Sequence, residues 1–72
     1  MEAAICRHVL AVLGRPKEFL RINVRHVTAD GYRVNVLAGA ELAFARVSHS
    51  YFIRADEDGR VTDSTPPIVK QY

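Results

Sequence analysis

The chain has 72 residues, of which 49% are hydrophobic and 25% charged, and its formal net charge is only +2. A chain of this length forms one small domain, residues 1–72, and its apolar content excludes an intrinsically disordered protein. Cys6 is the only cysteine, so an intramolecular disulfide is excluded and a reducing compartment is expected. Because so small a core is marginal, we expect very good packing or self-association to stabilise it.

The N-terminal segment resembles a signal peptide only superficially, because Glu2, Arg7 and His8 interrupt its apolar residues. No apolar run in the chain approaches the roughly 20 residues that span a bilayer. We therefore expect a soluble, cytoplasmic protein with no membrane partner.

Residues 2–13 have the spacing of an amphipathic helix. At about 100° per residue, one continuous arc holds the larger apolar side chains, which are Ile5, Cys6, Val9, Leu10, Val12 and Leu13. Gly14 suits a left-handed C-cap position, and Pro16 cannot continue a helix. The pattern predicts a helix that ends at Leu13.

After Pro16 the apolar period changes to that of a strand. Residues 20–27 and 32–38 alternate, and Ala29-Asp30-Gly31 between them is typical of a hairpin turn. A three-residue loop with Gly31 in the left-handed conformation keeps the apolar side chains on one face. It pairs Val24 with Val36, and Ile22 with Ala38.

Residues 43–55 have the two-residue alternation of a strand. The segment is long enough to pair first with the strand before it and then with a strand after it. A loop over residues 39–42 would set Ala38 opposite Ala43, and Val36 opposite Ala45. A second three-residue loop, at residues 57–59, would set Ala55 opposite Val61. Ser48-His49-Ser50 lacks packing bulk, so we expect either a bend there or a division into two strands.

These elements predict an α+β fold in the order α-β-β-β-β. One N-terminal helix packs on one face of a 3–4 stranded antiparallel meander sheet. Thr65-Pro66-Pro67 ends the sheet, and the residues after it are compatible with a short C-terminal helical turn.

One helix covers one face of a sheet, so the other face meets water or a partner. The predicted registers place Asn23, Leu37 and Phe44 in one row of that face, with Leu37 and Phe44 forming an apolar spot. The next predicted row is Arg25, Asn35 and Arg46. The candidate binding residues are Arg21, Asn23, Arg25, Arg33, Asn35, Leu37, Phe44, Arg46, Phe52 and Arg54.

Three interpretations of this face compete. In the first, arginine stems cover apolar surface and the face is simply solvated. In the second, it is a protein interface, most simply of a homodimer through the face or an edge strand, because interface cores are rich in arginine and aromatic residues. In the third, it binds single-stranded nucleic acid through arginine, asparagine and stacked aromatic side chains.

We favour protein association, with homo-oligomers as its simplest form, and keep single-stranded nucleic-acid binding as the alternative. Phe44 and Phe52 are eight residues apart, roughly 26 Å along a straight strand, which is too far for one stacking platform.

We expect no catalytic residues, no metal, no cofactor and no small-molecule substrate. Neighbours on a strand point to opposite faces, so His49 is not expected to act as a base for Ser48 or Ser50. Cys6, His26 and His49 lack the spacing of a zinc site. The acidic turn at residues 56–58 is too short to wrap a calcium ion. The sequence thus predicts a non-enzymatic binding domain.

Overall fold

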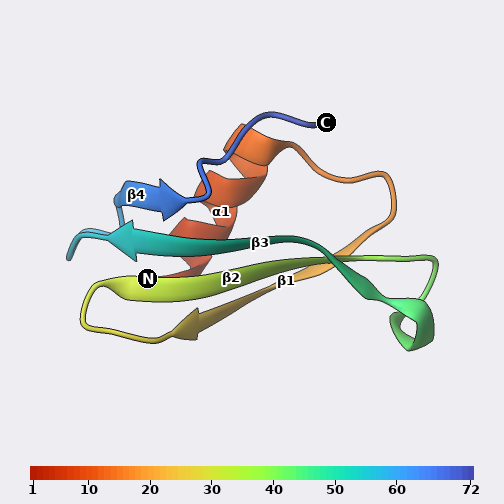
Figure 1. Ribbon diagram of the computed structural model, residues 1–72, viewed down its shortest axis with the longest axis horizontal. Helices are drawn as coiled ribbons and strands as arrows, with labels where there is room; N and C mark the ends of the chain where they lie inside the picture. Colours follow the sequence, from red (N-terminus) through yellow and green to blue (C-terminus); the bar gives the residue numbers. More distant parts are fainter.

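The computed structural model describes residues 1–72, apart from the side chain of Leu42. In chain order it contains α1 (Glu2–Leu13), β1 (Phe19–His26), β2 (Gly31–Ala38), the single 3-10 turn η1 (Leu42–Phe44), β3 (Arg46–Ala55) and β4 (Val61–Thr65). The strands form one antiparallel sheet in the order β1-β2-β3-β4 (Figure 1). The predicted α-β-β-β-β architecture is confirmed.

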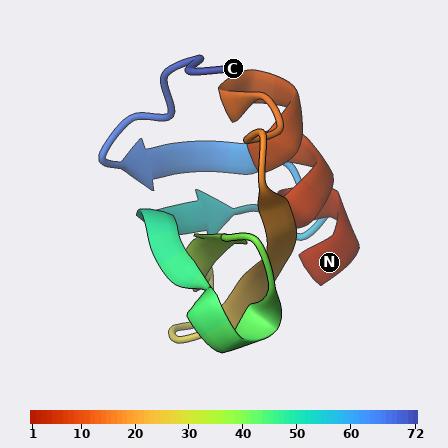
Figure 2. The same ribbon diagram turned by 90° about the vertical axis from the view of Figure 1, so that its right-hand side faces the viewer.

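Helix α1 has the predicted bounds, but Gly14 after it has a ψ of 166° and so does not form the left-handed C-cap that the sequence predicted. Gly14 has a φ of 88°, in the region that favours glycine, and its N–H donates to the Leu10 carbonyl at 3.0 Å. The apolar face of α1 buries Ile5, Val9 and Leu13. Figure 2 shows α1 on one side of the sheet, and no other element of the described chain covers the opposite side.

The core lies between α1 and the middle strands of the sheet. Strands β2 and β3 supply most of its sheet side, with Tyr32, Val34, Val36, Tyr51 and Ile53 all buried. Burial of each large apolar side chain contributes about 1.5–3 kcal/mol to stability. The core is therefore concentrated on two strands, and the apolar side chains of β1 are only half-buried.

The register of the first hairpin differs from the prediction by two residues. Val24 pairs with Val34, and Ile22 pairs with Val36. Gly31 belongs to β2 and is not in the left-handed conformation, because the turn closes earlier, with the Gly31 N–H on the Thr28 carbonyl at 3.3 Å. A shift of two residues preserves parity, so each side chain keeps its predicted face.

The connection between β2 and β3 is longer than predicted. Ala38 pairs with Arg46 rather than Ala43, and η1 lies in the connection. Val36 pairs with His49, which brings the large side chains of Tyr51 and Ile53 into the core. The predicted register would have placed smaller or polar residues there, so the observed one buries more apolar surface.

A β-bulge at Ser48 interrupts the pairing of β2 with β3. The register shifts between Val36 and Leu37, and the Ser48 hydroxyl donates to the Val36 carbonyl at 3.2 Å. An extra residue in one strand exchanges the faces of the residues beyond it. Val47 therefore lies beside Leu37 with 54% of its surface exposed, and Arg46 joins Ala38 on the face toward α1. Residues 46–55 are thus one bulged strand rather than two.

The third hairpin follows the prediction. Ala55 pairs with Val61, and Gly59 in the connecting turn has a φ of 83°. The Asp56 carboxylate accepts backbone N–H groups of Asp58 at 3.0 Å and Arg60 at 2.9 Å. This side chain therefore holds the acidic turn closed.

The C-terminal residues return to the end of α1 and do not form the helical turn that the sequence allowed. The N–H groups of Gln71 and Tyr72 both donate to the Leu13 carbonyl, at 2.9 and 3.1 Å. These bonds satisfy a carbonyl that has no partner inside the helix. Residues 66–72 therefore lie across the C-terminal end of α1, as Figure 1 shows, and are called the C-terminal strap below.

Candidate binding face of the sheet

The sheet face away from α1, here called the open face, has an unusual charge composition. Strands β1, β2 and β3 together contain five arginines, four of them on this face, and no aspartate, glutamate or lysine. The acidic residues lie in α1, in the connections and in β4. The three long strands are therefore a positively charged layer with an acidic boundary at one end.

Side chains of adjacent strands form three rows across the open face. The first consists of Arg21, Leu37 and Val47, the second of Asn23, Asn35 and Ser50, and the third of Arg25, Arg33 and Phe52. The Ser50 hydroxyl donates to the Asn35 side-chain oxygen at 2.7 Å, which orients that amide. The open face thus has a polar centre between a half-apolar row and an arginine–aromatic row.

Phe52 is positioned by Gly31. A Cβ at Gly31 would lie 2.5 Å from Cζ of Phe52, so the ring occupies the space above this glycine. Arg33 is the partner of Phe52 on β2, and Arg25 is the partner of Arg33 on β1. Phe52, Arg33 and Arg25 are therefore cross-strand neighbours on three successive strands.

Eight of the ten predicted residues lie on the open face, and two do not. Phe44 is in η1 and 72% exposed, so the predicted apolar spot of Leu37 and Phe44 is not formed. Arg46 is on the face toward α1, beside a hollow that Lys17 and Tyr72 also line. The prediction was wrong at these positions because a loop and a bulge change the register of β3.

Val47 and Ser50 are on the open face and were missed. The predicted register, which sets Val36 opposite Ala45, also sets Val34 opposite Val47 and so places Val47 toward the core, whereas Ser50 lies in the segment where a bend was expected. The only sequence signal for the observed arrangement is the small polar Ser48, whose hydroxyl can satisfy a backbone carbonyl at a bulge.

The arginines of the open face differ in their acidic neighbours. Nη1 of Arg54 is 3.8 Å from Oδ2 of Asp30, and Asp63 is its strand partner on β4. Among the described residues, Arg21, Arg25 and Arg33 have no carboxylate within ion-pair distance. These three therefore have their charge available for an anionic partner.

Ser48 and His49 lie closer together than alternation predicts. Nδ1 of His49 is 3.1 Å from the Ser48 hydroxyl oxygen, because the bulge turns Ser48 toward the side of its neighbour. The Ser48 proton is used in the bond to the Val36 carbonyl. Because that proton is in use, Nδ1 of His49 is the donor in this pair.

The remaining candidates for chemistry are dispersed. Over the described residues, no group of three or more His, Cys, Asp or Glu side chains is placed to hold a metal ion. His26 stacks on Tyr32, and His49 stacks on Tyr51, on different parts of the sheet. Burial, with a smaller contribution from Glu2, raises the pKa of the Cys6 thiol, which favours its protonated form.

Comparison with known proteins gives no match, whether to family models, to curated proteins or to solved structures. None of the helices in the described part of the chain has the length and apolar character to cross a bilayer.

Proposed function

We propose that the open face binds single-stranded nucleic acid. The observation that carries the proposal is the row of Arg25, Arg33 and Phe52 beside the row of Asn23, Asn35 and Ser50, on strands that contain no acidic residue. Cations that follow a backbone, an aromatic ring that stacks on a base and amides that contact base edges are the elements of single-strand recognition on sheets.

The same geometry makes a face-to-face homodimer less favourable than the sequence suggested. Such a dimer would bring the arginines of two copies together, and like charges in an interface cost several kcal/mol. Its centre would be the polar row of Asn23, Asn35 and Ser50, whereas stable interfaces have an apolar centre. An anionic partner has neither disadvantage.

The test is a titration of a short, labelled, mixed-sequence single strand, followed by fluorescence anisotropy at several salt concentrations. Three phosphate contacts predict a slope of about −2 for log Kobs against log salt concentration, at about 0.7 per contact. A matched duplex, whose bases are not free to stack on Phe52, should bind more weakly. Affinity that is independent of salt, or equal for the duplex, contradicts the proposal.

Self-association through the edge of β1 is a second candidate, favoured by a difference between the two edges of the sheet. The edge strand β4 has five residues, contains Asp63 and is followed by two prolines. The edge strand β1 has eight residues and contains neither proline, lysine nor an acidic residue. Prolines, charges and short length protect edges from pairing, and β1 has only the charges of Arg21 and Arg25 for this purpose, so it is the less protected edge.

Antiparallel pairing of two β1 strands has a favourable register centred on Val24. Residues 22, 24 and 26 direct their backbone groups away from β2, because the Val27 N–H already bonds the Gly31 carbonyl and the pattern alternates. Pairing Val24 with Val24 of a second copy sets Asn23 opposite Arg25 and leaves no two arginines directly opposite.

Light scattering over a dilution series tests this second candidate. We expect a dimer that Asn23→Lys shifts toward monomer, because the lysine would face Arg25 of the other copy. Thr65→Lys on the opposite edge is the control and should leave the mass unchanged. A monomer at all concentrations, or equal effects of both lysines, contradicts edge pairing.

Both candidates describe a non-enzymatic binding domain. The single free cysteine, Cys6, supports the cytoplasm as its location within this proposal.

A further inference from the structure

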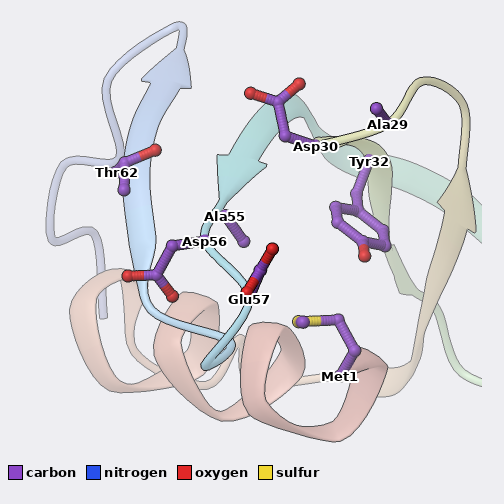
Figure 3. Close-up of a pocket in the computed structure, with 8 residues that line it drawn as sticks. All are labelled: Met1, Ala29, Asp30, Tyr32, Ala55, Asp56, Glu57 and Thr62. Atoms are coloured by element: carbon purple, nitrogen blue, oxygen red, sulfur yellow. The ribbon is translucent and has the colours of Figure 1, made fainter.

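A pocket of about 660 Å³ lies at the end of the sheet where two hairpins turn, away from the rows of the open face. Its walls come from the β1–β2 connection, from Tyr32 on β2 and from the β3–β4 turn, with the Met1 side chain at its base (Figure 3). This volume is within the range of about 300–1,000 Å³ that is usual for small-molecule sites.

The pocket is acidic. Three of its lining side chains are the carboxylates of Asp30, Asp56 and Glu57, none of its lining side chains is cationic, and the α-ammonium of Met1 is the one positive group that the lining residues carry. Asp30 has Arg54 at 3.8 Å, and Asp56 accepts two backbone N–H groups of its own turn. Glu57 has no hydrogen bond or ion pair with the described residues, and in Figure 3 its carboxylate extends into the space between the two hairpins. Glu57 is therefore the carboxylate with its full bonding capacity available.

Tyr32 provides an independent indication of a ligand. Only 6% of its surface is exposed, and its ring stacks on His26 with centroids 4.6 Å apart. None of the side-chain hydrogen bonds among the described residues involves its hydroxyl, which points into the pocket in Figure 3. No fully buried side-chain oxygen or nitrogen among the described residues lacks a partner, so the Tyr32 hydroxyl oxygen is accessible to solvent and can accept a hydrogen bond from a group inside the pocket.

We infer that this pocket binds an alkylammonium group. The Glu57 carboxylate and the Tyr32 hydroxyl oxygen accept N–H bonds from the ammonium, and Asp30 and Asp56 add negative potential. The side chains of Ala29, Ala55 and Met1 give the attached methylene groups apolar contacts. The three carboxylates make the pocket less favourable for an anionic ligand than for a cationic one.

Two sources carry this chemistry, a free aliphatic amine and a lysine side chain of a peptide. An amide NMR titration of the full chain distinguishes them, with cadaverine as the free amine, Nα-acetyl-lysine methylamide as the lysine and pentanol as the uncharged control. We expect saturable shifts of the Asp30, Tyr32 and Glu57 amides with at least one amine and none with pentanol. Tighter binding of cadaverine identifies a free amine, and tighter binding of the lysine amide identifies a peptide. Equal shifts with pentanol, or no saturable shift with either amine, overturn the inference.

Two substitutions locate the ammonium. Glu57→Gln removes the charged acceptor and should weaken amine binding by about tenfold or more. Tyr32→Phe keeps the ring and removes the free hydroxyl, so binding should weaken by about 2- to 10-fold.

Asp58→Asn is the matched control, because this acid is in the same turn but does not line the pocket. Its affinity should stay within about twofold of the unmodified chain. An equal loss from Asp58→Asn and Glu57→Gln would show general surface attraction and overturn the site, as would unchanged binding by Glu57→Gln. Thermal unfolding of each variant verifies that it is folded.

Discussion

The ring of Phe52 lies directly over Gly31, in the space that any larger residue on β2 would fill. A Cβ at Gly31 would be 2.5 Å from Cζ of Phe52 and 2.4 Å from Oγ1 of Thr28. The glycine therefore determines where the one aromatic side chain in the rows of the open face lies.

We expect Gly31→Ala to lower the free energy of unfolding by about 1–3 kcal/mol, because the ring and the Thr28 hydroxyl must both move. Urea denaturation measures this loss. In a Phe52→Ala background the same substitution should cost less, since the ring is gone and only Thr28 has to move. A cost that is equal in both backgrounds would show that the Gly31–Phe52 contact is not the cause.

Gly14 and the C-terminal strap form a second close approach. Gly14 has a φ of 88°, and a Cβ there would be 2.7 Å from the Tyr72 carbonyl carbon. Gly14→Ala should lower the free energy of unfolding by about 1–3 kcal/mol. It should also speed hydrogen exchange at the Gln71 and Tyr72 amides, whose bonds to Leu13 require the strap in place. Ala3→Gly, at an exposed helix position, is the control and should leave these two amides unchanged.

Arg33 and Arg46 form a matched pair for the proposed nucleic-acid site. Arg33 is in the central strand of the open face, and Arg46 is on the face toward α1. Arg33→Gln should weaken single-strand binding and reduce the salt slope by about 0.7. Arg46→Gln removes the same charge from the chain and should change neither quantity. Equal effects of both variants in the anisotropy titration would mean that net charge, rather than the open face, governs binding.

Ionisation of the Tyr51 hydroxyl should lower the free energy of unfolding at alkaline pH. Burial, and to a smaller extent the nearby Tyr72, raises the pKa of the Tyr51 hydroxyl in the folded chain. A raised pKa means that the unfolded chain releases this proton first, so the contribution to stability is complete below about pH 10 and is lost as pH rises above it. Urea denaturation across this range should show a shallower decline for Tyr51→Phe than for the unmodified chain. Tyr72→Phe removes only the smaller cause and should have an intermediate effect, and identical declines in all three would contradict this origin.

Much of the fold is contained in local patterns of the sequence. The 3.6-residue period of residues 2–13, with Gly14 and Pro16 after it, specifies the helix and its end. Strict alternation assigns Arg21, Asn23 and Arg25 to one face, and any register error of two residues leaves that assignment intact. The turn at Glu57–Gly59 is specified by local residues alone. The Asp56 carboxylate accepts its backbone N–H groups, and Gly59 adopts the positive φ that it needs.

The rest depends on contacts between segments that are distant in the chain. The register of β3 follows from burying Tyr51 and Ile53 beneath α1, and alternation does not distinguish this register from one displaced by four residues. The bulge at Ser48 then exchanges the faces of Arg46 and Val47, because a single extra residue inverts a period of two. The pocket forms where two turns more than twenty residues apart in sequence meet, which places Tyr32 and Glu57 around one space. Local periodicity specifies which side of an element is apolar, whereas packing across the sheet selects which residues become neighbours.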